Sequence, residues 1–382
     1  FGDLSGGTIS QPRETLLHQF RPVGYGADAD LFIFNSHFEA GREFEDLAGR
    51  ETEATQIRNY IDSNNLGNRN VIVAGDLNTG SNFESTGLQT FGDQSALEIL
   101  ASPGSGRVLD PLFPNGESVD FRIFNTGVPN TQFGVDLGPF LTQSPSAQGG
   151  ALIGGGIDDR FDFILQSDEL LDFEGVASIS GSLRTFGNDG STPNTRINNG
   201  NDISINGLTS FTTDQVLDAL EAASDHLPVV TDFQLPAVLD AQLVDFVPET
   251  VQLGETVELE VRIRNAANVA IALGADELDF DLTTLGDVFG SATGVDDALG
   301  GDVSAFVTLD TSEVGFQNGL IAVTSQSISA ANDVVFIPIA FEVTAIPEPN
   351  AVWALGIFGS AWLCRRRRGR TSVSTKITLS DA

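Results

Sequence analysis

The stretch at residues 71–78 reads Val-Ile-Val-Ala-Gly-Asp-Leu-Asn, in which four apolar residues lead directly into a glycine and two polar side chains. A short apolar run that ends in turn residues is typical of a buried strand. The run Leu-Phe-Ile-Phe at 31–34 ends in a similar way, at Asn-Ser-His, and residues 43–64 carry apolar side chains at helical spacing. A strand, a helix and a strand in this order predict a layered α/β domain.

The chain continues this pattern to about residue 235. Residues 102–160 are rich in Gly, Pro and Asn and predict long surface loops. A short strand is expected at 161–165 and a helix at 213–223. The segment Ser-Asp-His-Leu-Pro at 224–228 then leads into an expected strand at 229–233. We therefore assign residues 1–235 to one α/β domain.

A different pattern begins at residue 236. Residues 257–264 alternate strictly between apolar and charged side chains, which is typical of a strand with one buried face. Further alternating runs are separated by turns such as Asn318-Gly319. The spacing predicts a small all-β sandwich over residues 236–345. This stretch contains no histidine, and we assign it no chemistry.

The C-terminal region has the features of a membrane segment. Pro347-Glu348-Pro349 is followed by an uncharged apolar run, 351–364, that holds both tryptophans, and then by four arginines. Tryptophans near both ends suit the two membrane interfaces, and the arginines suit the cytoplasmic side. The run is short for a spanning helix, and a core helix of the sandwich is the alternative. We expect a sorting segment with a short membrane helix at 346–370 and a polar tail at 371–382.

Composition narrows the classes of function. The formal net charge is −34, and residues 1–364 hold 13 basic and 52 acidic side chains. Such a body repels polyanions and argues against a general nucleic-acid coat protein, but it leaves room for an enzyme with a local cationic site or a bound metal. A salt-adapted or calcium-rich exterior favours the same acidic excess. The single cysteine excludes a disulfide within the chain and a thiolate zinc site.

Four motifs in one order resemble the endonuclease/exonuclease/phosphatase superfamily. They are Asn-Ser-His-Phe-Glu-Ala at 35–40, Gly-Asp-Leu-Asn at 75–78, Arg-Phe-Asp-Phe-Ile-Leu at 160–165 and Ser-Asp-His-Leu-Pro at 224–228. The resemblance covers residues 13–233. It implies a four-layer α/β/β/α sandwich that is incomplete at the N-terminus, because the family carries an Asn and a metal-binding Glu upstream of these motifs. The first part of the domain is therefore expected to be missing.

The chemistry of phosphoester hydrolysis gives each motif residue a role. Asp76 is expected to orient or deprotonate the attacking water. Asn78 is expected to lie on the same side of an extended segment, two residues on, and to donate to a phosphoryl oxygen. His226 is expected to hydrogen-bond the phosphoryl group, with Asp162 holding its ring in one tautomer. Asp162 as a strand-end turn residue is the alternative. His37 is expected to be a second acid/base group near the leaving oxygen.

Two further residues have looser assignments. Asp225 is a candidate ligand for Mg²⁺, or for Mn²⁺ or Ca²⁺, because such ions take carboxylate oxygens and water. Arg13 lies where some deoxyribonuclease-like members have a phosphate-binding arginine, and a solvated surface arginine is the alternative.

The tail resembles a PEP-CTERM sorting signal, since Pro-Glu-Pro, an apolar run and an arginine cluster follow one another. The resemblance implies an exported protein that is transiently membrane-anchored, recognised by a membrane-embedded sorting enzyme, and released to or retained at the cell surface. Such signals normally end soon after the arginines, whereas this chain continues to residue 382.

The leading interpretation is an exported, metal-dependent endonuclease or phosphodiesterase. A lipid or inositol-phosphate phosphodiesterase is the alternative within the same chemistry. A surface or matrix protein whose catalytic domain has decayed is the alternative from another class.

Overall fold

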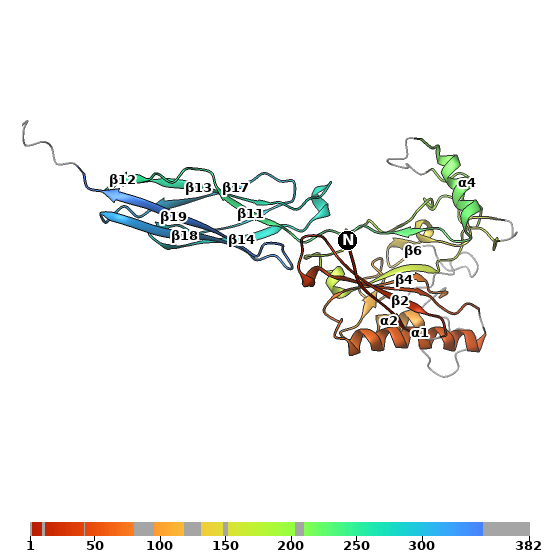
Figure 1. Cartoon of the computed structure of the whole chain (residues 1–382). Helices are drawn as coiled ribbons and strands as arrows, with labels where there is room; N and C mark the ends of the chain where they lie inside the picture. Colours follow the sequence, from red (N-terminus) through yellow and green to blue (C-terminus); the bar gives the residue numbers. More distant parts are fainter. Residues whose placement is uncertain are drawn as a thin grey trace, which may run out of the picture.

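The computed structural model describes residues 2–9, 12–41, 43–79, 95–117, 131–147, 152–202 and 210–346, with the backbone alone for 2–9. Figure 1 shows an elongated molecule of two lobes. The first lobe holds the helices, and the second consists of strands. The buried apolar clusters of the first lobe end before residue 235, and those of the second begin at Ala237.

The first lobe is built on a six-stranded sheet. Strands β3 and β4 are parallel, because helix α1 (Phe44–Ser63) carries the chain back between them, and the other neighbours pair antiparallel. In spatial order the strands are β1 (Gly2–Ile9), β2 (Thr15–Arg21), β3 (Leu31–His37), β4 (Asn70–Asp76), β8 (Asp162–Ser167) and β5 (Val108–Leu109).

Strand β4 is buried on both faces, which explains its unbroken apolar run. Val71 and Val73 pack into the core that α1 covers, where Ile57 and Ile61 of the helix are fully buried. Ile72 points to the opposite face and packs into a second, smaller core. Helix α2 (Ala96–Ala101) contributes to the same core as α1. The helix expected at 43–64 is confirmed as α1.

The other face of the lobe carries short elements. Helix α4 matches the expected helix at 213–223 and is closed by a capping box from Thr212 and Gln215. The expected strand at 229–233 is only two residues long. The remaining elements are β6 (Thr131–Gln132), β7 (Val135–Asp136), β9 (Arg184–Thr185), β10 (Val229–Val230), α4 (Thr213–Ala223) and the 3₁₀ turns Ala27–Ala29, Gly138–Phe140 and Asp168–Leu170.

The expected four-layer sandwich is not confirmed. In the described part of the first lobe, the sheets beside the six-stranded one are the two-residue ladders β9–β10 and β6–β7. The lobe as described is mostly sheet with few helices. Side-chain hydrogen bonds hold loops of this lobe together, as where Asn188 donates to the carbonyls of Gly138 and Leu141.

The second lobe consists of two sheets packed face to face. Leu259, Val261 and Ile263 of β13 are buried between them, and the alternating charged residues face outward. One sheet has the order β11 (Leu239–Leu243), β13 (Glu258–Asn265), β17 (Val303–Leu309) and β15 (Val288–Phe289). The other has the order β12 (Thr250–Gln252), β19 (Val334–Thr344), β18 (Gly315–Ser325), β14 (Leu278–Gly286) and β16 (Ala292–Asp296), with the 3₁₀ turn Ala272–Gly274 at one end.

Hydrogen bonds join the two lobes. The amide of Gly175 donates to Oδ2 of Asp276 at 2.8 Å, and the hydroxyl of Tyr25 donates to the carbonyl of Pro236 at 2.9 Å. The backbone of Leu235 exchanges further bonds with the second lobe, accepting from the amide of Asp276. The junction is therefore a bonded interface.

The expected membrane helix and the polar tail lie outside the described residues. Across the part of the chain that is described, no helix has the length and apolar character needed to cross a membrane.

Candidate active site

The register of the six-stranded sheet brings three predicted site residues into one row. His37 ends β3, Asp76 ends β4 and Asp162 begins β8. Asp76 is the direct partner of His37 in the parallel ladder and of Asp162 in the antiparallel ladder. The three side chains therefore lie on adjacent strands at one end of the sheet.

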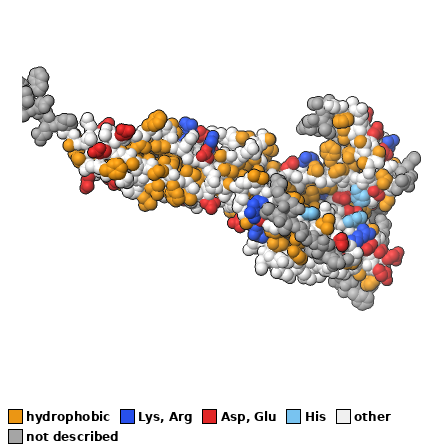
Figure 2. Space-filling model, in the orientation of Figure 1, with side chains coloured by type: hydrophobic (Ala, Val, Ile, Leu, Met, Phe, Trp, Pro, Cys, Tyr) orange, Lys and Arg blue, Asp and Glu red, His pale blue; other side chains and the backbone are white. Residues whose placement is uncertain are grey.

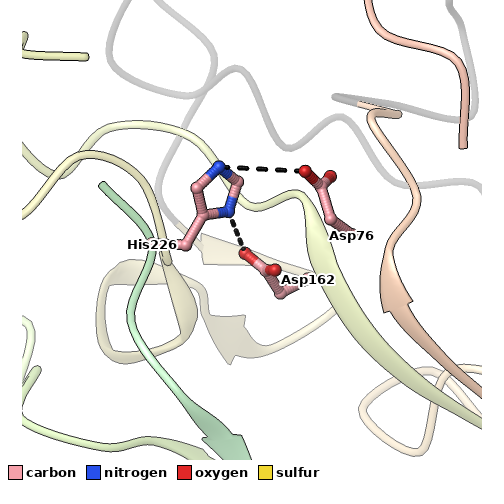
Figure 3. Close-up of side chains that lie close together, drawn as sticks. All are labelled: Asp76, Asp162 and His226. Carbon is pink, nitrogen blue, oxygen red and sulfur yellow. Dashed lines mark hydrogen bonds and ion pairs between the residues drawn. The ribbon is translucent and has the colours of Figure 1, made fainter. Parts of the chain in front are cut away.

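His226 reaches this row from a distant part of the chain. Figure 3 shows its ring between the two carboxylates. Its Nδ1 lies 2.7 Å from Oδ2 of Asp162, and its Nε2 lies 3.8 Å from Oδ2 of Asp76. The backbone amide of His226 donates to the hydroxyl of Ser224 at 3.0 Å, which fixes the turn that carries the ring. The expected pairing of Asp162 with His226 is thus present, and it places the other ring nitrogen, Nε2, toward Asp76.

His37 approaches the same oxygen of Asp76 from the neighbouring strand β3. Its Nε2 lies 3.4 Å from Oδ2 of Asp76, and its side chain is 63% exposed. Asp76 and His226 are far less exposed, at 17% and 21%. Asp76 therefore has two imidazoles near one carboxylate oxygen, of which one is solvent-accessible and the other is mostly enclosed.

Gly75 and Asn78 shape the backbone on either side of Asp76 and Leu77. Gly75 has φ +135°, and a Cβ there would lie 1.9 Å from the carbonyl oxygen of Ser36 on β3, so only glycine fits. Asn78 has φ +48°, so the extended geometry expected for it is wrong. Its backbone amide donates to Oδ1 of Asp76 at 2.9 Å, and its side-chain amide donates to the carbonyl of Phe38 at 2.9 Å.

Arg13 and Asp225 have other partners. Arg13 donates to Oε1 of Glu39 at 3.1 Å, and its backbone amide binds the buried Glu53. Oδ2 of Asp225 accepts from the amide of Ile153 at 3.3 Å. Neither residue belongs to the close group of Asp76, Asp162 and His226, whose ligand-type atoms lie within 4.8 Å of one another.

Gln143 is a site residue that the sequence did not indicate. Its Nε2 lies 2.8 Å from Nε2 of His226, the ring nitrogen that does not bind Asp162. Backbone bonds hold Gln143 there, since its amide donates to the carbonyl of Asp159 and the amide of Leu227 donates to the carbonyl of Thr142. No spacing or motif marks this glutamine, because its place depends on the pairing of three distant segments.

Opposing effects act on the pKa of Asp76 and on that of His226. Burial raises the pKa of Asp76, and the negative charge of Asp162 adds to this, although the bond from Asn78 and the two imidazoles act in the other direction. Burial alone would lower the pKa of His226, but the hydrogen bond and charge of Asp162, with Asp76 and Asp225, raise it above its ordinary value. Both groups therefore hold a proton more readily than they would in water.

The donor set fits a divalent cation in part. Oxygens of Asp76 and Asp162 are the hard ligands that Mg²⁺, Mn²⁺ and Ca²⁺ take. Nδ1 of His226 is already bonded to Asp162. The carboxylates, with water, would therefore hold an ion here, and the imidazole would remain outside its first ligand sphere.

No described protein family and no curated protein matches the sequence. Solved structures with similar shape include an endonuclease/exonuclease/phosphatase from Beutenbergia cavernae, at TM-score 0.33 and 12% identity, over 88% of this chain and 72% of that one. Truncated Caenorhabditis elegans TDP2 has TM-score 0.27 and 16% identity, over 47% of this chain and 57% of that one. The CARDB domain of a Pyrococcus furiosus protein, in complex with di-metal ions, has TM-score 0.20 and 13% identity, over 28% of this chain and 86% of that domain. TM-scores this low assign neither a family nor a function.

Proposed function

We propose that this chain is a metal-assisted phosphoester hydrolase whose first lobe is a catalytic domain of the endonuclease/exonuclease/phosphatase type. The observation that carries the proposal is the array of Asp162, His226 and Asp76, with His37 next to it, at one end of a β-sheet. The four-layer sandwich remains an element of this proposal. The motif order in the sequence supports it.

The residues divide the reaction between them. A water molecule forms the new P–O bond, and Asp76 accepts its proton, which the raised pKa of this carboxylate assists. When substrate binds, a phosphoryl oxygen takes the place of the Gln143 amide beside Nε2 of His226. The ring, charged and oriented by Asp162, then donates from Nε2 to that oxygen as negative charge develops there. The P–O bond to the leaving group breaks, and His37 is placed to return a proton to the leaving oxygen. A divalent ion on the carboxylates would supply a Lewis acid for the phosphoryl oxygens.

Substitution at the array tests the proposal on the full-length protein. Asp76→Asn and His226→Ala should each lower the rate of phosphodiester hydrolysis by at least about 10²-fold, the scale for losing a general base or a charge-stabilising donor. Chelation of divalent ions should abolish activity, and Mg²⁺, Mn²⁺ or Ca²⁺ should restore it.

His18→Ala is the matched control, because His18 lies on β2 outside the array. A folded protein that hydrolyses no phosphoester in the presence of these metals would replace this function with the decayed-enzyme alternative.

We also propose, from the sequence, that residues 346–370 direct export, recognition by a sorting enzyme and transient membrane anchoring. Removal of residues 347–382 should shift the protein from the membrane fraction to the soluble fraction of the host. Equal partition of both forms would contradict this role.

A further inference from the structure

The two outer faces of the second lobe differ in charge. On the four-stranded sheet, β13 turns charged side chains outward, and its two arginines form ion pairs with Asp240 and Asp302. On the five-stranded sheet, β18 contains no charged residue, and Glu342 near the end of β19 is the only one in that strand. In Figure 2, hydrophobic side chains cover much of the visible face of this lobe.

The apolar side chains on the outside of the five-stranded sheet lie next to one another. The register places Leu285, Leu320 and Pro338 in one row across β14, β18 and β19, and Ala322 and Phe336 in the next row. Leu285 is 66% exposed and Phe336 is 60% exposed. Contiguous exposed apolar patches mark places where another element or molecule packs. We call this patch the outer apolar face, which consists of Leu285, Phe316, Leu320, Ala322, Phe336 and Pro338.

The same chain contains an apolar segment of matching length. The face extends along β19 from Glu342 back to Val334, which is about 26 Å at the rise of an antiparallel strand. The uncharged run at 351–364 follows β19 after a linker at 345–350, and the linker can reach about 20 Å. A helix over 351–364 would be about 21 Å long. The run can therefore fold back from the end of β19 and cover the face.

Charges at the far end of the face favour the same occupant. Asp279 and Asp281 of β14 point outward there, because their neighbours in the strand are buried and Asp281 lies in the row that ends at Val334. The only two arginines of residues 236–346 are already paired on the other sheet. Four arginines, 365–368, follow the apolar run directly. A run that folds back along the face brings these arginines beside the two carboxylates.

We propose that, away from a membrane, residues 351–364 cover the outer apolar face of their own second lobe, with the arginines at 365–368 beside Asp279 and Asp281. The contact removes two apolar surfaces from water together. Membrane anchoring exchanges the sheet for lipid around the same segment and leaves the face open. The inference goes beyond the catalytic proposal and does not depend on it.

Tryptophan fluorescence measures this contact directly. Trp353 and Trp362 are the only tryptophans of the chain, and both lie in the apolar run. The test uses the full-length protein in buffer without detergent or lipid. We expect a blue-shifted emission maximum and an acrylamide quenching constant several-fold lower than that of the same protein in urea. Both values should be independent of protein concentration, because the segment covers its own lobe.

Substitutions on the two sheets distinguish the face from the rest of the lobe. Phe336→Asp places a charge within the face, so the emission should shift to the red and the quenching constant should rise several-fold. Leu285→Asp, in the neighbouring row, should have the same effect. Phe306→Asp is the matched control, since Phe306 is 55% exposed on the outside of the other sheet, opposite Glu260, and it should leave both values unchanged. Circular dichroism verifies that each variant keeps its β structure.

Three results would overturn the inference. Exposed tryptophans in the wild type would show that nothing covers the segment, and they would leave the proposals on catalysis and on membrane anchoring standing. Tryptophans that stay protected in both Phe336→Asp and Leu285→Asp are buried somewhere other than on this face. Protection that is lost on dilution, together with a dimer in sedimentation, would place the segment on a second copy.

Discussion

The array of the first lobe depends on backbone register more than on side-chain reach. His37, Asp76 and Asp162 are direct partners across three strands, so the ladder hydrogen bonds determine their spacing. His226 comes from a loop, and its ring is fixed by Asp162 on one nitrogen and Gln143 on the other. The protonation behaviour of His226 should therefore respond to these partners.

Replacement of Asp162 tests this coupling. The hydrogen bond and negative charge of Asp162 raise the pKa of His226 against the effect of burial. Asp162→Asn removes the charge, so the pKa of His226 should fall, and the imidazole should lose its proton at a lower pH than in the wild type. Because the chain has only three histidines, ¹H NMR titration can follow each one.

The signal of His18, which stacks on Phe20, is the internal control and should not differ between the two proteins. A pKa of His226 that Asp162→Asn leaves unchanged would contradict the orienting role.

The sequence predicted the pairing of Asp162 with His226 because both residues lie in recognisable motifs at strand ends. It did not predict Gln143, whose position depends on three segments far apart in the chain. The prediction that Asn78 lies in an extended segment was wrong. The chain instead turns there into the left-handed region, which asparagine tolerates.

At the scale of elements, the close pairing of β3 with β4 at their C-terminal ends depends on one glycine. A methyl group at Gly75 would meet the carbonyl oxygen of Ser36 at 1.9 Å, and φ +135° is itself strained for an L-residue. Gly75→Ala should therefore lower the free energy of unfolding by about 2–4 kcal/mol, as backbone strain and a steric clash combine. Urea denaturation, monitored by circular dichroism, measures this free energy.

Gly24→Ala is the matched control. Gly24 also has a positive φ, +97°, but nothing lies within 4 Å of the added Cβ. Gly24→Ala should lower the free energy of unfolding by only about 1–2 kcal/mol, because backbone strain acts there without a steric clash. If the two variants lose the same unfolding free energy, a Cβ at position 75 does not clash with the carbonyl of Ser36.

The helix bounds predicted from the sequence agree closely with those of α1 and α4. The same reasoning overestimated the strand at 229–233. Val229 and Val230 pair only with the short β9, and the apolar pattern alone does not reveal how long a partner strand is.

At the scale of the whole molecule, the two lobes meet across an acidic junction. The Gly175 turn of the first lobe donates to Asp276, which is 5% exposed, and Glu174 and Glu277 add negative charge nearby. The sequence indicated the change of pattern at residue 236 but not this contact, because it joins residues 101 positions apart.

Asp276 should make the stability of the whole chain depend on pH. Burial, with the charges of Glu174 and Glu277, raises its pKa from 3.8 to about 6 in the folded protein. Below the unfolded value the carboxyl is protonated in both states, and its contribution to stability is fully present. This contribution is lost as the pH rises through about 6, because the folded state must then hold a buried charge.

Asp276→Asn isolates this effect. The amide oxygen can still accept from Gly175, and any bond lost to the amide of Glu277 is a constant cost that does not vary with pH. The difference in unfolding free energy should therefore move in favour of the variant by about 1–2 kcal/mol between about pH 4 and about pH 7, after allowance for solvent screening. Urea denaturation of both proteins across this range gives the difference directly. If it stays constant with pH, Asp276 titrates alike in the folded and unfolded chain, and the junction is more open to water than its hydrogen bonds indicate.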